Sequence, residues 1–97
     1  MRTGRAVSAT LSAYMGDRKK TPTEAFGVVL RELRVEKGLT QEGLALDAGT
    51  ERSHISALER AEKGPSLGTI LRLAQALGIS AGDVVSRVEQ KLAEKNR

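Results

Sequence analysis

Apolar residues recur at spacings of three and four along residues 21–93 of this chain, which is the period of helices that bury one face. No segment alternates apolar and polar residues over a useful length, as a half-buried strand does. Glycine, proline, serine or threonine separates the apolar runs, and such residues cap and end helices. The pattern therefore predicts an all-α fold, a compact bundle of five helices joined by short loops.

The first helix is expected to begin within Thr21–Glu24, a capping-box sequence with proline at the first helical position, and to end near Lys37. Its inner stripe is expected to be Phe26, Leu30 and Leu33. Farther along, Ser66 is placed to cap a fourth helix that Gly78 ends. This helix is expected to bury Leu67, Ile70, Leu73, Ala74 and Leu77.

The second and third helices are predicted within Leu39–Arg60, where a tight turn joins them. Thr40 occupies the N-cap position of the second helix, and Gly49 can end it in the left-handed region without steric cost. The third helix turns Ile55 and Leu58 inward, and it is too short to be stable unless it packs against the second. Its outward residues are Arg52, Ser53, His54, Ser56 and Arg60. This is a helix-turn-helix whose second helix has the polar composition to enter a groove of DNA.

A fifth helix is expected to start at Ala81 and to continue into a C-terminal extension at residues 87–97. Its apolar residues, again three and four apart, are Val84, Val85, Val88 and Leu92. A stripe that continues beyond the point where a small bundle closes needs a partner. One interpretation is that Val84, Val88 and Leu92 join two copies into a homodimer, because two-fold symmetry doubles the area that contacts DNA. The alternative is that they fold back onto the first helix of the same chain.

The net charge of +4 belongs to an N-terminal arm at residues 1–20. Five basic residues and one acidic residue fall in this arm, which leaves eleven of each sign in residues 21–97. The basic balance is therefore no evidence that the helical domain at residues 21–86 attracts DNA by its charge. The arm is expected to be mostly disordered, with a transient helix. The alternative is an arm that follows the phosphates of DNA or enters its minor groove. Helix-like spacing in the arm joins Val7, Leu11, Tyr14 and Met15.

Composition argues against several kinds of site. The chain has no cysteine and one histidine, so neither a disulfide nor a metal site is expected. It has no constellation of nucleophile and base and no phosphate loop, and a small bundle offers no large pocket, so we expect no catalytic residue, no cofactor and no enzyme activity. No apolar run reaches the roughly 18 residues of a membrane span, and there is no signal-peptide pattern. The expected compartment is the cytoplasm.

Helical spacing also predicts an internal ion pair between Arg34 and Glu59. Glu59 follows Ile55 by four residues and Arg34 follows Leu30 by four residues, so both border the inner faces of their helices. An unpaired buried charge is costly, whereas the guanidinium fork can hold a carboxylate through two parallel hydrogen bonds. The alternative is two solvated surface charges.

The order and spacing of several short motifs resemble one known family. The motifs are Phe-Gly-x-x-Leu-Arg-x-Leu-Arg, Gly-Leu-Thr-Gln, Ile-Ser-x-Leu-Glu-Arg, Pro-Ser-Leu and Leu-Ala-x-Ala-Leu, and they fall between Phe26 and about Val85. They resemble the Cro and lambda-repressor-like (Xre) helix-turn-helix regulators. The resemblance implies a five-helix lambda-repressor-like domain that binds a pseudo-palindromic operator in double-stranded DNA, usually as a homodimer. Ala61 stands where the family usually has glycine, which indicates a different exit from the third helix, with Gly64 as the candidate.

The resemblance also assigns DNA-contacting positions. Thr40 and Gln41 open the second helix, where free N–H groups and the helix dipole suit a phosphate oxygen, and the matching Gln of the family braces the recognition helix. The first turns of the third helix enter the major groove and carry Arg52, Ser53, His54 and Ser56. Arg52 can reach guanine O6 and N7 or a phosphate, and the sequence leaves both open. Arg60 belongs to the same polar surface, and Lys63 follows in a loop that usually lies near a phosphate.

Two other functions stay open at this point. Antitoxins of the same fold sequester a protein partner and repress their own operon, so a toxin that copurifies with the chain would indicate that class. Restriction-modification controller proteins are a further class of similar length. The sequence favours a sequence-specific DNA-binding transcription regulator over both.

Overall fold

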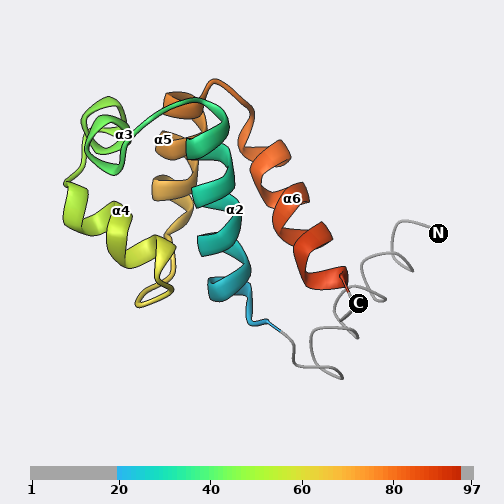
Figure 1. The fold of residues 1–97 in the computed structure, drawn as a ribbon. Helices are drawn as coiled ribbons and strands as arrows, with labels where there is room; N and C mark the ends of the chain where they lie inside the picture. The colour runs from blue at the N-terminus through green and yellow to red at the C-terminus, as the bar shows by residue number, and fades with distance from the viewer. Residues whose placement is uncertain (1–19, 95–97) are drawn as a thin grey trace.

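A computed structural model describes residues 20–94, and the helices of this range follow one another without an intervening strand (Figure 1). They are α2 (Pro22–Glu36), α3 (Gln41–Ala48), α4 (Arg52–Glu59), α5 (Leu67–Leu77) and α6 (Ala81–Ala93). The predicted all-α fold of five helices is confirmed for these residues. Apart from Lys20, the arm predicted at residues 1–20 lies outside the described residues. No helix among residues 20–94 is long and apolar enough to cross a membrane.

Side-chain caps start four of the helices at the expected residues. The hydroxyls of Thr21, Thr40, Ser66 and Ser80 each accept a hydrogen bond from the N–H group three residues farther on. Each cap satisfies one of the first N–H groups that a helix leaves without an internal partner. Helix α4 is the exception, because its N-cap Glu51 makes no side-chain cap bond.

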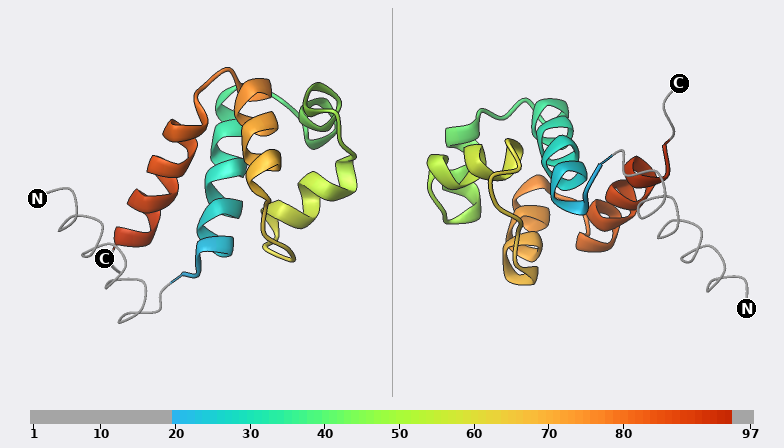
Figure 2. Two further views of the ribbon diagram at one scale, coloured as in Figure 1. Left: turned by 180° about the vertical axis from the view of Figure 1, so that it is seen from behind. Right: turned by 90° about the horizontal axis from the view of Figure 1, so that it is seen from below.

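Each helix packs mainly against two others, so that the helices form a closed ring in which α2 lies between α4 and α6 (Figure 1). Helix α2 packs against α6 on one side and against α4 on the other. Helix α3 packs against α4 and α5, and α5 packs against α6, which closes the ring behind α2 (Figure 2). The short helices α3 and α4 therefore reach the rest of the bundle through two main packing contacts, α4 against α2 and α3 against α5.

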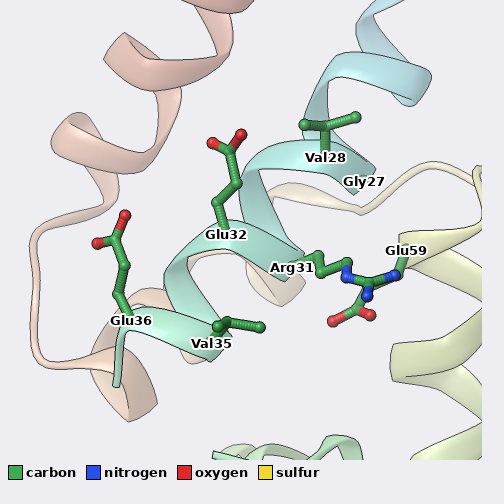
Figure 3. A pocket seen from close by; sticks show the side chains of 7 residues that line it. All are labelled: Gly27, Val28, Arg31, Glu32, Val35, Glu36 and Glu59. Atoms are coloured by element: carbon green, nitrogen blue, oxygen red, sulfur yellow. The ribbon is translucent and has the colours of Figure 1, made fainter. Parts of the chain in front are cut away.

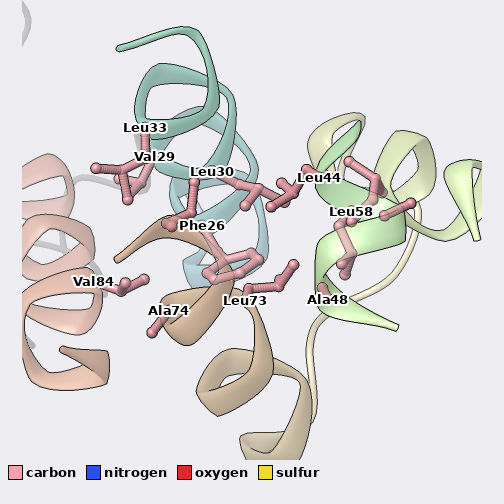
Figure 4. Close-up of a cluster of buried hydrophobic side chains, with 13 residues drawn as sticks. Phe26, Val29, Leu30, Leu33, Leu44, Ala48, Leu58, Leu73, Ala74 and Val84 are labelled. Atoms are coloured by element: carbon pink, nitrogen blue, oxygen red, sulfur yellow. The ribbon is translucent and has the colours of Figure 1, made fainter. Parts of the chain in front are cut away.

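The core inside this ring is aliphatic except for the aromatic ring of Phe26 (Figure 4). Its members are Phe26, Val29, Leu30, Leu33, Leu44, Ala45, Ala48, Ile55, Leu58, Leu73, Ala74, Leu77 and Val84. Full burial of a Leu, Ile or Phe side chain contributes roughly 1.5–3 kcal/mol. Since helices as short as α3 and α4 are unstable alone in water, this burial is what holds them in place.

Two residues of the predicted α5 stripe are less buried than expected, since Leu67 is exposed and Ile70 is half-buried at the edge of the core. Leu67 is 71% exposed, and Leu71 is exposed on the same outer side of the helix. The buried residues of α5 centre on Leu73, and at about 100° per residue Leu67 lies about 120° around the helix from it. The expectation that Leu67 is buried was therefore wrong, because α3 and α6 cover only one side of α5.

Helix α6 packs along α2 and is held there by apolar and charged contacts. Val84 is 2% exposed, and Val88 packs against the core from its edge. Lys91 Nζ lies 3.1 Å from a carboxylate oxygen of Glu32, and Arg87 donates to Glu36 on α2. The predicted dimer role of Val84 is corrected, because Val84 is buried in its own chain and has no surface left for a second copy. The alternative, folding back onto the first helix, holds for this residue.

Candidate nucleic-acid interface

Helices α3 and α4 pack together through a turn at Gly49, which has a left-handed φ of 72°. After it, the N–H group of Thr50 donates to the carbonyl oxygen of Ala45 at 2.9 Å. The chain therefore leaves α3 and starts α4 within three residues. Ile55 and Leu58 of α4 are fully buried, as predicted. Because one face of α4 is anchored in the core, its other faces are available to a ligand.

The outward residues of α4 differ in exposure along the helix. Arg52 and Ser53, in the first turn, are exposed, whereas His54 and Ser56 are half-buried. In Figure 1 this N-terminal end of α4 lies at the outer edge of the molecule below α3, and the other end lies toward α2. The structure thus brings these four predicted residues together in the first five residues of the helix, with the first two exposed and the other two half-buried.

The side chain of His54 is oriented by Thr50, a residue that was not among the predicted site residues. Thr50 Oγ1 and His54 Nδ1 are 2.9 Å apart, a hydrogen bond whose direction depends on the tautomer of the ring. The bond occupies Nδ1 and leaves Nε2 as the ring nitrogen that can contact a ligand. The sequence contains one signal for this bond: Thr50 precedes His54 by four residues, a spacing that brings a side chain in the turn near one on the first turn of the helix.

Glu59, at the other end of α4, is held by two other helices. Arg34 donates from Nε to Glu59 Oε2 at 2.7 Å and from Nη2 to Glu59 Oε1 at 3.1 Å, so the expected pair is bidentate. Gln41 Nε2 also donates to Oε1, at 3.0 Å. The hydrogen bond to Glu59 raises the pKa of the Arg34 guanidinium, against the opposite effect of burial. Arg34 and Glu59 are 12% and 4% exposed, which places the pair inside the domain and not on its surface.

Gly27 allows α2 to approach the end of α4 more closely than a residue with a side chain would. A Cβ atom on Gly27 would lie 2.7 Å from the carbonyl oxygen of Leu58 and 2.8 Å from that of Glu59. Both oxygens belong to the backbone, so they cannot move without a shift of α4. Figure 3 shows Gly27 and Glu59 among the residues that line an open groove of about 660 Å³ beside α2. Gly27 therefore sets the distance between α2 and the anchored end of α4.

The exit from α4 differs from the one expected. Ala61 has a φ of 60°, in the left-handed region that glycine usually occupies. Its N–H group donates to Leu58, and the N–H group of Glu62 donates to Ala57, which is the hydrogen-bond pattern of a Schellman motif. The predicted exit through Gly64 is therefore wrong. The chain turns at Ala61 in spite of its Cβ atom, at a cost on the order of 1–2 kcal/mol.

Charges around α4 nearly balance. The exposed basic residues Arg52, Arg60 and Lys63 lie along the same part of the chain as exposed Glu51 and Glu62. Arg60 Nε lies 3.0 Å from Glu62 Oε2, but both side chains are more than half exposed, so the pair contributes little and Arg60 can change partners. Within residues 20–94 no three acidic or histidine side chains are placed to hold a metal ion. The surface offers positioned hydrogen-bond donors instead of a strong positive field.

The first turn of α3 lies next to this surface. Thr40 is exposed, and its Oγ1 accepts from the N–H group of Gly43 at 2.9 Å, so the residue is an N-cap. Gln41 is half-buried, and its hydrogen bond to Glu59 makes it a brace for the end of α4. The remaining N–H groups of this turn and the helix dipole form an electropositive end that suits an anion.

Several known proteins are similar to this chain. It is 41% identical over 58 residues to an uncharacterized HTH-type transcriptional regulator, y4dJ, of Sinorhizobium fredii, and the match covers 60% of this chain and 75% of the relative. The solved structure of the restriction-modification controller protein C.AhdI of Aeromonas hydrophila is 45% identical, with a TM-score of 0.62 over 64% of this chain and 94% of that one. The clp gene regulator ClgR of Corynebacterium glutamicum is 32% identical, with a TM-score of 0.73 over 77% and 80% of the two chains.

Some relatives are longer than the part that matches, and the chain spans 59% and 63% of the length of two of them. The helix-turn-helix family profile matches residues 30–84, which contain α3, α4 and the turn between them. This range is more than half of the chain, and it confirms the family that the sequence motifs indicated. The chain belongs to the Xre-type helix-turn-helix family.

Proposed function

We propose that this chain is a sequence-specific DNA-binding transcription regulator that places α4 in the major groove of an operator. The observation that carries the proposal is the position of Arg52 and Ser53. Both are exposed on the first turn of a helix whose inner face is buried and whose far end is held through Glu59. Eight helical residues are about 12 Å long, and the major groove, about 12 Å wide, admits an α-helix.

Direct base contact is assigned to Arg52, because its guanidinium can donate two hydrogen bonds to guanine O6 and N7. Ser53, Ser56 and the free Nε2 of His54 supply further donors or acceptors along the same groove. Phosphate contacts are assigned to the first turn of α3 at Thr40 and Gln41, and to Arg60 and Lys63 beyond α4. Phosphate contacts fix the position of the protein on the duplex, and base contacts determine the sequence.

The proposal includes a homodimer on a pseudo-palindromic operator, with Val88 and Leu92 of α6 at the interface. Both side chains are half-buried in one chain, and Val85 beside them is 42% exposed. A second copy would cover the apolar surface that α2 leaves open, and two copies would place one α4 in each half-site. Sedimentation at rising concentration tests this part. A chain that stays monomeric at high concentration and binds a single half-site would exclude the homodimer.

Selection of bound sequences from random duplex DNA tests the main proposal. We expect a pseudo-palindromic consensus, and Arg52→Ala should lose roughly 1–3 kcal/mol of affinity for it and relax one base position in each half-site. Arg72→Ala is the matched control, because it removes an exposed arginine from α5 outside the helix-turn-helix. Equal binding to all sequences by the wild type would contradict sequence-specific reading. An equal loss on all sequences for Arg52→Ala would make this residue a phosphate contact.

A narrower candidate is a restriction-modification controller. It is favoured by the 45% identity to C.AhdI, of which the match covers 94%. A controller is itself a DNA-binding regulator, so the two proposals differ in the genes that are regulated. Mapping of bound sites in the source genome separates them: sites beside a restriction or methyltransferase gene support the controller, and sites elsewhere exclude it.

A further inference from the structure

An apolar groove lies where the start of α2 meets α5 and α6. It is lined by Pro22 and Phe26 of α2, Pro65 of the loop before α5, Ile70 of α5, and Val85 and Val88 of α6. Its volume is about 280 Å³. Figure 1 shows the beginning of α2 beside the C-terminal half of α6, and Figure 2 shows the same neighbourhood from below. The site is separate from the exposed end of α4.

The size and lining of the groove limit what it can hold. Small-molecule sites usually have about 300–1,000 Å³ and a few polar groups that orient the ligand. This groove is smaller, and its lining is mostly hydrocarbon, so it suits a few apolar side chains of a peptide segment that lies across its opening. Val85, at its rim, is 42% exposed, and covering such a side chain is favourable.

We propose that residues 11–15 of the same chain occupy this groove with Leu11, Tyr14 and Met15. These three residues are spaced as one face of a helix turn. The segment joins the domain at the rim of the groove, because Lys20 is half-buried and Pro22 and Thr23 line it. Lys20 follows Met15 by five positions, and five extended residues span up to about 17 Å, which is enough to lay the segment across the opening.

Because the segment is covalently linked to the domain, it is favoured over a separate molecule as the occupant of the groove. A short tether holds its end at an effective concentration in the millimolar range, so weak apolar contacts suffice. Charge is also complementary, because Arg18 and Lys19 follow the apolar residues, and exposed Glu89 lies one turn beyond Val85 on the same face of α6. The docked segment would cover Val85 and Val88, so docking competes with the proposed homodimer, which also uses Val88. Docking does not depend on the proposed DNA-binding function.

Tyr14 gives a direct measurement of docking, because it is the only tyrosine and the chain has no tryptophan. Quenching of its fluorescence by acrylamide, a neutral quencher, should be several-fold weaker in the full chain than in a peptide of residues 1–20. Val85→Asp should raise quenching to the level of the peptide. Leu46→Asp is the matched control, since Leu46 is 80% exposed on α3, and it should leave quenching unchanged.

Three outcomes would overturn the proposal. The first is equal quenching in the full chain and the peptide. The second is that Tyr14 stays protected from quenching in the Val85→Asp variant, while the circular dichroism of the variant shows that it is still folded. The third is protection that disappears on dilution, because docking within one chain is independent of concentration and a second copy would then be the occupant. If Val85→Asp does not fold, Leu11→Ser with Met15→Ser decides the question, since it leaves the groove intact and should raise quenching to the same level.

Discussion

The two ends of α4 are built in opposite ways. At the C-terminal end, Arg34 and Gln41 both hold Glu59, and Gly27 brings the backbone of α2 against the last turn. At the N-terminal end there is no side-chain cap, and Arg52 is exposed. The anchored end has its polar groups paired inside the domain, whereas the exposed end keeps its donors for a ligand.

This difference explains how an eight-residue helix can present side chains accurately. The helix has only two buried large side chains, so packing alone leaves its tilt weakly determined. A bidentate ion pair and a backbone contact at one end fix the tilt, because both require a defined distance and direction. At the other end, Arg52 and Ser53 stay exposed, and the bond between Thr50 and His54 leaves the Nε2 of His54 for a ligand. Changes at the anchored end should therefore affect stability first, and changes at the exposed end should affect binding alone.

The largest expected effect is the loss of the buried pair. Glu59→Ala should lower the free energy of unfolding by roughly 3–5 kcal/mol, because it leaves the Arg34 charge buried without a partner. Glu62→Ala is the matched control; its pair with Arg60 is exposed, and it should cost less than about 1 kcal/mol. Urea denaturation measures both. A loss under about half a kcal/mol for Glu59→Ala would show that the pair behaves as a surface interaction.

A smaller loss is expected where α2 and α4 approach each other. Gly27→Ala should cost roughly 1–3 kcal/mol, because the new methyl group collides with two backbone oxygens. Gly68→Ala on α5, where a Cβ atom would make only ordinary van der Waals contacts with the side chains of Arg72 and Ser66, should instead gain up to about 1 kcal/mol from helix preference. Denaturation curves of the two variants give the comparison. Equal stability of Gly27→Ala and Gly68→Ala would show that α2 and α4 do not approach each other as closely as described above.

The smallest effect is a gain at the exit of α4. Ala61→Gly should stabilise the chain by about 0.5–1 kcal/mol, since relief of the left-handed strain exceeds the added flexibility of the unfolded chain. The control is Ala57→Gly inside α4, which should cost about 1 kcal/mol. Thermal unfolding distinguishes the two variants, because the unfolding midpoint temperature should rise for Ala61→Gly and fall for Ala57→Gly. Destabilisation by Ala61→Gly would mean that the chain does not turn at this residue.

Local rules and helical periodicity predicted much of this arrangement. The caps at Thr21 and Ser66 and the inward position of Ile55 follow from neighbouring residues alone. Arg34 and Glu59 lie 25 residues apart, yet each borders the buried stripe of its helix, so their meeting could be anticipated from two independent periodicities.

Features that depend on how helices cross could not be obtained in this way. Leu67 has the spacing of a buried residue, but which side of α5 is covered depends on α3 and α6. The role of Gly27 depends on the separation between the backbones of α2 and α4, and the spacing of apolar residues along the chain does not reveal that separation. Ala61 takes the left-handed conformation because the hydrogen bonds at the end of α4 stabilise it against the local preference of alanine. The bond between Thr50 and His54 depends on side-chain directions at a turn.

Binding of DNA by the exposed end of α4 can be observed by NMR, from the amide chemical shifts of the chain with a duplex of the selected operator. We expect the largest shifts in the first turn of α3 at residues 40–42 and in residues 50–56. Amides of α6 and the far end of α5 should stay unchanged, and a scrambled duplex should shift residues 50–56 less. Largest shifts on α6, or none in residues 50–56, would contradict the claim that the exposed end of α4 reads DNA.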